Sequence, residues 1–374
     1  MLLAGSAVAQ EREFTTIQAS GTIDPRAATA LQTVYPKQHH YAKGRFVDHI
    51  WLLVLDHATY ADASANADLQ ALEKYGQKLT NYYALTHPAQ ANFLGMIGGD
   101  TFGLTDERFV ALPKNVSTIV ESLEDQRVLW AQYTEDQPFT GYPGWDYANP
   151  YGGNYTRSSN GFIAFDSVAH SAKRLANLKS WLNFEQDVES GHIAQWLMLR
   201  PNGEHDGSVS LESGASFARN LLEPFLQDKK KFHRHIFILT FAHAGDDADS
   251  NQVYTLLLGD VPHKLKGTTD NTYYDHYSII STTQGNWDLP SLGRYDCGAN
   301  VFEIFNKHVH HKNVASLHDS LNNDILSGYL SSVDTPLPLP NVNCEGAGRQ
   351  GVLKRVKKLW NKVSYAYYQW TFDY

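Results

Sequence analysis

The strongest constraint on the fold of this chain is a series of short, uninterrupted apolar runs. They lie at residues 49–56 (HIWLLVLD), 195–199 (QWLML), 235–241 (HIFILTF) and 253–259 (VYTLLLG), with stretches of helical pattern between them. Strands that are apolar on both sides belong to a sheet that is covered on both faces, and their alternation with helices favours parallel pairing. The sequence therefore predicts an α/β fold, a three-layer sandwich around a mainly parallel central sheet.

The composition limits the class of protein and of partner. The chain has 374 residues, 42% of them apolar and 19% charged, as expected for a globular protein with a substantial core. Its net charge of −9 excludes nucleic acid as the main partner, because phosphate backbones require a basic surface. No apolar run approaches the roughly 18 residues of a membrane-spanning helix.

Local signals place further elements between the first two runs. Thr118 followed by Glu121 is a helix-capping pattern, and Gly residues end the other two helices. Residues 137–165 are rich in Gly, Pro, Asn, Tyr and Trp without periodicity, which predicts a long functional loop or a lid over the site. The predicted elements are helices at 67–75, 88–97 and 118–124 and a strand at 128–133.

The chain divides by pattern into four predicted parts. An arm without periodicity precedes the first strand, and a Pro- and Asn-rich stretch ends the compact region. The first nine residues are either the remnant of a signal peptide, since Ala7-Val8-Ala9 resembles a cleavage site, or a coincidence of small residues. With sequons at Asn115 and Asn154, this start predicts a glycosylated protein that is secreted or enters the secretory pathway. The predicted parts are residues 1–9, 10–44, 45–332 and 333–374.

The C-terminal extension carries a basic amphipathic pattern. Within residues 352–363, Val352, Val356, Leu359 and Val363 share one helical face, Lys and Arg occupy the others, and an aromatic run follows. Such a pattern predicts either peripheral contact of residues 352–374 with an anionic membrane or a protein, or a terminal helix packed on its own domain.

The two cysteines leave two alternatives open. Cys297 and Cys344 either form one disulfide that ties the late loop at 341–346 back to the domain, or remain two separate buried thiols.

Two features point to the chemistry. Asp56 closes the first apolar run, and the carboxyl ends of parallel strands are where such sheets gather their sites. Thr86 stands just ahead of Pro88, which opens a predicted helix. A metal-held carboxylate beside a hydroxyl at a helix N-terminus suits phosphoryl or sulfuryl transfer.

Two long strings carry a resemblance to a known family: LTNYYALTHPAQANFLGMIGGDTFG at 79–103 and GTTDNTYYDHYSIISTTQGNWDLPSLGRYDCGANVF at 267–302. They resemble the fungal acid phosphatase branch of the phosphoesterase family, within the alkaline phosphatase superfamily. The resemblance implies an alkaline-phosphatase-like sandwich in which residues 45–332 form the phosphoesterase-like domain. It also implies hydrolysis of phosphomonoesters through a covalent phospho-enzyme.

The resemblance assigns roles to particular residues. Thr86 falls at the nucleophile, and His205 at the leaving-group acid or a metal ligand. The positions implied to bind substrate are Asn92, His87 and Asp206, and those implied to bind metal are Asp56, His57, His243 and His276.

The metal positions depart from the family pattern. The family usually has Glu-Asn where this chain has Asp56-His57, and an acidic pair where it has Ala242-His243. Alanine cannot bind a cation, although Asp246 or Asp247 is close enough in sequence to supply a carboxylate. The remaining set is rich in imidazole, so it favours Zn²⁺ or Fe over Mg²⁺ as a divalent metal. If it binds no metal, imidazolium groups can still hold an anion.

Three functions therefore stay open. The first is acid phosphatase-like hydrolysis of a small-molecule phosphate ester by a Thr nucleophile. The second is a catalytically degenerate member that binds an anionic ligand or a partner. The third is a pocket recruited for other acid–base chemistry in a biosynthetic pathway.

Overall fold

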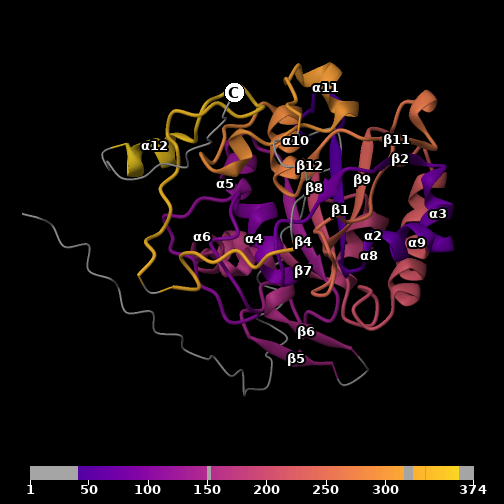
Figure 1. Cartoon of the computed structure of the whole chain (residues 1–374), viewed down its shortest axis with the longest axis horizontal. Helices are drawn as coiled ribbons and strands as arrows, with labels where there is room; N and C mark the ends of the chain where they lie inside the picture. The colour runs from indigo at the N-terminus through magenta and orange to yellow at the C-terminus, as the bar shows by residue number, and fades with distance from the viewer. Residues whose placement is uncertain (1–40, 150–152, 316–322, 333, 362–374) are drawn as a thin grey trace, which may run out of the picture.

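The computed structural model describes residues 41–149, 153–315, 323–332 and 334–361. These residues form an eight-stranded sheet in the order β11-β2-β10-β9-β1-β8-β4-β7. Figure 1 shows helices on both sides of the sheet, with α4 and α5 on one side and α3, α8 and α9 on the other. The strands are β1 His49–His57, β2 Gly76–Leu79, β4 Trp130–Thr134, β7 Leu178–Ser180, β8 Trp196–Arg200, β9 His235–His243, β10 Thr255–Gly259 and β11 Thr268–Asp270.

Helices and two small sheets complete the described fold. The helices are α2 Tyr60–Ala65, α3 Ala67–Glu73, α4 Ala89–Gly98, α5 Ile119–Asp125, α6 Asp166–Ala169, α7 Ala172–Leu175, α8 Trp181–Ser190, α9 Leu211–Gln227, α10 Tyr277–Trp287, α11 Glu303–Val309 and α12 Lys354–Trp360. The small sheets pair β3 Tyr82–Tyr83 with β12 Tyr274–Asp275, and β5 Asp146–Ala148 with β6 Asn154–Thr156. No helix among the described residues is long and apolar enough to cross a bilayer.

The predicted three-layer α/β sandwich with a mainly parallel sheet is confirmed. β1 pairs in parallel with β8 and β9, and β4 pairs in parallel with β7 and β8. The run at 253–259 is the exception, because β10 lies antiparallel to both β9 and β2. All nine residues of β9 are buried, as expected for a strand covered on both faces.

The strand β9 is longer than predicted. It continues past Phe241 through Ala242 to His243, because His243 pairs in register with His57 at the end of β1. Parallel strands end at the same edge of a sheet, so Asp56, His57 and His243 meet there, next to Arg200 at the end of β8.

The helix that follows Thr86 has the predicted position. α4 begins after Pro88 at its N-cap and ends at Gly99, which adopts a left-handed conformation (φ 73°) that glycine accepts without strain. Thr118 and Glu121 form the predicted capping box of α5.

The segment at 137–165 differs from the prediction of a lid. Its second half enters the core, where Phe162 and Phe165 are fully buried and the ring of Phe162 lies 5.3 Å from that of Trp130. The lack of periodicity in this Gly-, Pro- and aromatic-rich stretch therefore gave no sign of a segment that packs into the core. In the first half, Asn149 donates a hydrogen bond to Asp136, which follows β4.

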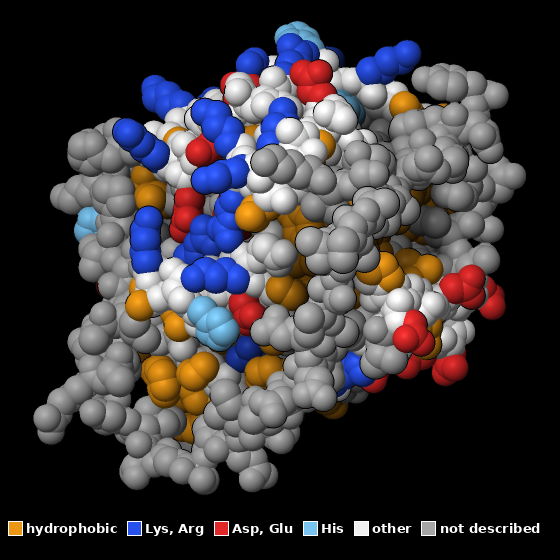
Figure 2. Space-filling model, turned by 90° about the vertical axis from the view of Figure 1, so that its left-hand side faces the viewer, with side chains coloured by type: hydrophobic (Ala, Val, Ile, Leu, Met, Phe, Trp, Pro, Cys, Tyr) orange, Lys and Arg blue, Asp and Glu red, His pale blue; other side chains and the backbone are white. Residues whose placement is uncertain are grey.

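The C-terminal helix packs on the domain through one side. Val352 and Val356 are buried, whereas Leu359 is 45% exposed and Val363 lies outside the described residues. Figure 2 shows Lys and Arg side chains gathered on the side of the molecule that carries α12, where Lys354, Lys357 and Lys358 are exposed. Contact of residues 352–374 with a membrane or a partner stays a prediction, as do the domain boundaries.

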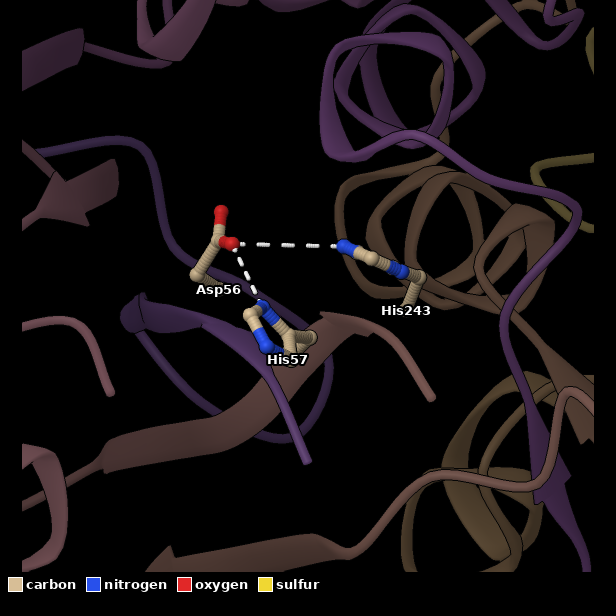
Figure 3. A group of neighbouring side chains, drawn as sticks. All are labelled: Asp56, His57 and His243. Atoms are coloured by element: carbon tan, nitrogen blue, oxygen red, sulfur yellow. Dashed lines mark hydrogen bonds and ion pairs between the residues drawn. The ribbon is translucent and has the colours of Figure 1, made fainter. Parts of the chain in front are cut away.

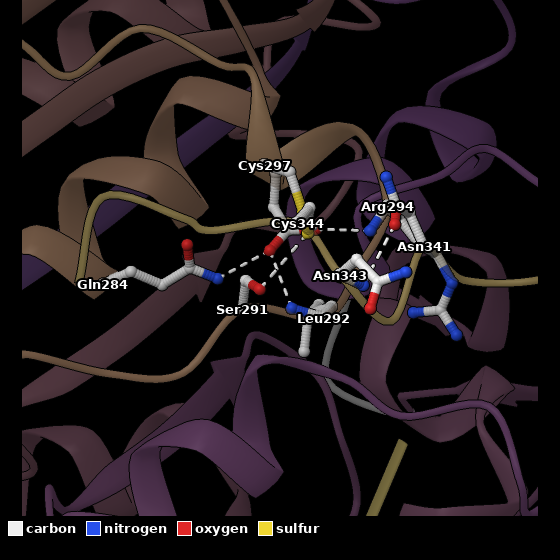
Figure 4. Close-up of a disulfide and its surroundings, with 9 residues drawn as sticks. Gln284, Ser291, Leu292, Arg294, Cys297, Asn341, Asn343 and Cys344 are labelled. Atoms are coloured by element: carbon white, nitrogen blue, oxygen red, sulfur yellow. Dashed lines mark hydrogen bonds between the residues drawn. A yellow bond between two sulfur atoms is a disulfide. The ribbon is translucent and has the colours of Figure 1, made fainter. Parts of the chain in front are cut away.

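The two cysteines form one disulfide. Cys297 and Cys344 are bonded with their Cα atoms 6.1 Å apart, which excludes the alternative of two separate thiols. Figure 4 shows the bond beside Ser291 and Asn341, where the late loop meets the turn after α10. Next to it, the buried carboxylate of Asp296 accepts hydrogen bonds from the side chain of Gln284 and the backbone N–H of Leu292.

Removal of this disulfide should lower the free energy of unfolding. The cysteines are separated by 47 residues, so in the chain-entropy model the bond stabilises the fold by about 4 kcal/mol. We expect the double variant Cys297→Ser/Cys344→Ser to lose about 2–4 kcal/mol in urea unfolding. A reducing agent should destabilise the wild type by the same amount and leave the variant unchanged. If it destabilised both proteins, its effect would not come from this disulfide.

Buried histidines should make the fold sensitive to acid. His235 stacks on His49 with ring centroids 3.9 Å apart, and burial lowers the pKa of His235 from its ordinary 6.5 to about 4. Below pH 6.5 His235 takes up a proton in the unfolded chain but not in the folded one. The free energy of unfolding is therefore highest above pH 6.5 and falls as the pH is lowered towards 4. At pH 5 this residue alone should lower the free energy of unfolding by about 2 kcal/mol relative to pH 7.

The variant His235→Phe tests this expectation. The difference in unfolding free energy between pH 7 and pH 5 should shrink by about 2 kcal/mol relative to the wild type. His170→Phe, at a largely exposed histidine, is the control and should leave the pH dependence unchanged. Parallel curves for all three proteins would contradict the prediction.

Candidate active site

Three of the predicted metal ligands form a cluster at the carboxyl edge of the sheet. The Oδ2 atom of Asp56 lies 2.9 Å from Nδ1 of His57 and 3.9 Å from Nε2 of His243 (Figure 3). One ligand atom from each residue lies within 4.8 Å of the other two. We call these three residues the triad. One carboxylate and two imidazoles form a set that can hold a metal ion.

The charges within the triad are set by burial and by contact. Burial acts to raise the pKa of Asp56, but the hydrogen bond with His57 and the charge of Arg200 outweigh it, so the pKa is lowered. The same hydrogen bond raises the pKa of His57. Burial lowers the pKa of His243 to about 4, so this imidazole is neutral in mildly acidic solution. A neutral imidazole next to an ionised carboxylate is in the state that metal coordination requires.

Thr86 lies in a turn that is held from below by Asn92. The side-chain oxygen of Asn92 accepts hydrogen bonds from the backbone N–H groups of Leu85 (2.8 Å) and Thr86 (3.3 Å). Its amide nitrogen donates to the carbonyl oxygens of Thr86 (2.6 Å) and Pro88 (3.3 Å). Asn92 therefore fixes the turn at the start of α4, and the phosphate contact expected of it stays a prediction.

The hydroxyl of Thr86 is covered. Thr86 is fully buried; its Oγ1 donates to the carbonyl oxygen of Asp324 (2.8 Å) and accepts from the N–H of Leu326 (3.2 Å). Asn323 extends the cover, since its carbonyl oxygen lies 3.0 Å from Nε2 of His87 and its amide donates to Gly245 (2.6 Å). We call residues 323–326 the strap. No pattern in the sequence placed these residues at the site.

Asp246 links the turn to the triad. Its Oδ1 lies 3.3 Å from Nδ1 of His87 and 3.8 Å from Nδ1 of His243. Of the two acidic residues that follow the third apolar run, Asp246 is therefore the one that reaches the site. Among the described residues, this carboxylate lies between His87 and the triad.

Two predicted residues follow β8. His205 is half exposed; its Nδ1 lies 2.9 Å from Oε1 of Glu135, and its ring stacks on Phe217 at 4.7 Å. Asp206 accepts a hydrogen bond from the backbone N–H of Asp56 through its own carbonyl oxygen (2.7 Å), which ties its loop to the triad. Glu135 was not predicted as a site residue, because it follows a different strand.

Arg200 is the principal residue that the sequence analysis missed. It is 1% exposed, and its Nη2 lies 3.8 Å from Oδ1 of Asp56 and 3.6 Å from Oδ2 of Asp206. Burial raises the pKa of Asp206, Arg200 lowers it, and Asp56 raises it again, with a net rise. A charged residue directly after the apolar run at 195–199 was the available signal.

His276 lies outside the triad. Its Nε2 is 2.9 Å from the carbonyl oxygen of Ala242, and its Nδ1 is 3.0 Å from the hydroxyl of Tyr82. Both ring nitrogens are therefore engaged in the core below the site, and burial lowers its pKa to about 3. The structure brings together three of the four predicted metal ligands and leaves this one apart.

Comparison with known proteins finds a family model and named relatives that are similar to this chain. The model of the phosphoesterase family matches residues 58–290. A Kluyveromyces lactis protein named "Probable acid phosphatase" is 35% identical over 366 residues, covering 96% of this chain and 86% of its own. An acid phosphatase from Aspergillus fumigatus is 36% identical over 282 residues, covering 74% of this chain and 63% of its own.

Among solved structures, a protein in the alkaline phosphatase superfamily from Vibrio parahaemolyticus aligns with 70% of each chain, at 12% identity and a TM-score of 0.42. The family match covers more than half of the chain, and the K. lactis relative exceeds 30% identity over nearly all of it. This chain belongs to the phosphoesterase family.

Proposed function

We propose that this protein hydrolyses phosphomonoesters in the manner of an acid phosphatase, with Thr86 as the nucleophile. The observation that carries the proposal is that the triad lies close to the Thr86 turn. The carboxylate of Asp246 connects the two, because it contacts His87 in the turn and His243 in the triad. The turn lies at the N-terminus of α4, where backbone N–H groups and the helix dipole favour an anion. The names of the fungal relatives support the same substrate class.

The triad fits a divalent metal of the kind that accepts imidazole. Asp56, His57 and His243 would hold it, and Zn²⁺ or Fe suits this set better than Mg²⁺, which prefers oxygen ligands. When bound, the metal would polarise a phosphoryl oxygen and neutralise charge on the phosphate.

The residues of the chain have separate tasks in the reaction. The oxygen of Thr86 bonds to phosphorus and its hydroxyl proton passes to solvent water, while the bond from phosphorus to the ester oxygen breaks. His205, oriented by Glu135, donates a proton to the departing oxygen. In the second step the oxygen of a water molecule bonds to phosphorus and the bond to the Thr86 oxygen breaks. Thr86 regains a proton from this water, His205 regains one from solvent, and phosphate is released. Asn92 keeps the turn rigid, so the oxygen attacks from a fixed position.

The strap has to withdraw before Thr86 can react. Two of the three hydrogen bonds of its hydroxyl go to strap backbone, and the third goes to the carbonyl oxygen of His87 (3.3 Å). The strap thus occupies the space that a phosphate needs. The strap is loosely held, since Ile325 is 49% and Leu326 is 44% exposed. The same cover favours the second function, a degenerate member that binds without hydrolysis, if the strap never opens.

Substitution of Thr86 separates these two functions. We expect Thr86→Ala to reduce phosphate release from an aryl phosphate by at least about 10³-fold, because the covalent step requires the hydroxyl. Thr86→Ser keeps a hydroxyl and should retain measurable turnover. Release should be measured from pH 4 to 7 beside the wild type. Equal rates for wild type and Thr86→Ala would exclude Thr86 as nucleophile, and a folded but inactive wild type would favour the binding protein.

Metal binding tests the triad directly. Wild type loaded with Zn²⁺ or Fe and then desalted should carry one equivalent by elemental analysis. His243→Gln and Asp56→Asn should each weaken binding by more than about 100-fold, since even residues that only support ligands contribute 10–100-fold. His170→Gln, far more exposed, is the matched control and should keep the ion. Unchanged binding in both triad variants would show that the metal lies elsewhere.

A further inference from the structure

Arg200 carries a positive charge at a place where burial makes an unpaired charge costly. Its side chain is only 1% exposed. Its Nη1 donates to the carbonyl oxygen of Val54, and its guanidinium lies 4.3 Å above the ring of Phe93 in α4. Its buried Nε has no hydrogen-bond partner among the described residues.

The two carboxylates near Arg200 lie too far from its guanidinium to form short charge-assisted hydrogen bonds. Nη2 lies 3.6 Å from Asp206 and 3.8 Å from Asp56, beyond the 2.7–2.9 Å or so of a charge-assisted hydrogen bond. A bidentate ion pair that only stabilised the fold would close these distances. The guanidinium instead occupies a position between two acids, as a shared cation does.

The carboxylate of Asp56 faces two positions that can each hold a positive charge. Its Oδ2 faces the imidazoles of His57 and His243, whereas its Oδ1 faces Arg200. A carboxylate that presents one oxygen to each of two positive centres is arranged as in sites with two metal ions, which lie about 3.5–4 Å apart. Here the first position is left to a metal ion, and the second, between the carboxylates of Asp56 and Asp206, is filled by the guanidinium of Arg200.

We propose that Arg200 is a built-in cation of the active site, which holds the place between Asp56 and Asp206 that a second metal ion would otherwise take. This chain then binds one metal ion. The inference deepens the proposed function and rests on it in one respect, namely that the triad binds an ion. This charge would help to neutralise a phosphate, and chelators do not remove it.

The test counts ions rather than turnover, with Zn²⁺ as the probe. Metal-free protein is titrated calorimetrically, and the bound ion is counted by elemental analysis. The wild type should bind one Zn²⁺ and Arg200→Met two, because the variant leaves two carboxylates facing an uncharged space. Arg200→Lys keeps the charge and should bind one. The double variant Arg200→Met/Asp206→Asn lacks one wall of the new site and should also bind one.

Each outcome decides the matter. Two ions in the wild type, or one in a folded Arg200→Met variant, would overturn the inference. Arg200→Gln keeps a donor for Val54 and serves the same comparison if the Met variant does not fold. A purely structural Arg200 would change the unfolding free energy but not the ion count. If the wild type binds no Zn²⁺, both this inference and the metal in the proposed function are wrong. If the wild type and the Arg200→Met variant each bind one Zn²⁺, only this inference is wrong and the proposed function is unaffected.

Discussion

The parallel pairing of β1 with β9 is the interaction on which the site depends. It runs from His49↔His235 to His57↔His243, so the triad is assembled by the register of two central strands. A shift of one residue would turn every side chain of a strand to the opposite face of the sheet. Seven of the nine residues of β1 and all nine of β9 are buried, so packing specifies the register on both faces. The triad therefore depends on the packing of the core rather than on loops.

The second fixed part is the Thr86 turn, and its cover is held much less firmly. Every residue of α4 is buried, and Asn92 joins the helix to the turn by four hydrogen bonds. The strap contacts the hydroxyl through two hydrogen bonds, while its apolar side chains face solvent. Segments with few buried apolar contacts open at low free energy. Uncovering Thr86 thus costs less than distorting the turn that positions it.

The fold and the triad could be predicted because their signals are local. Apolar runs mark the strands, a Pro marks the start of α4, and side chains at the ends of parallel strands must meet at one edge. The partners of single polar groups follow from long-range packing and carry no such signal. Glu135 beside His205, the strap over Thr86 and the buried partners of His276 are of this kind. Arg200 was hidden for a related reason, because an arginine that ends an apolar run usually points to solvent.

The structure gives a reason why the lack of a carboxylate at position 242 affects the site less than the sequence suggests. Ala242 is fully buried and its carbonyl oxygen lies 2.9 Å from Nε2 of His276, so this residue belongs to the packing below the site. The loop after β9 supplies an acid instead, since Asp246 comes within 3.8 Å of His243. Around Asp56 the remaining groups are a protonatable His57 and the fixed charge of Arg200. In the proposed function, the charge of Arg200 would help such a site to attract a phosphate anion.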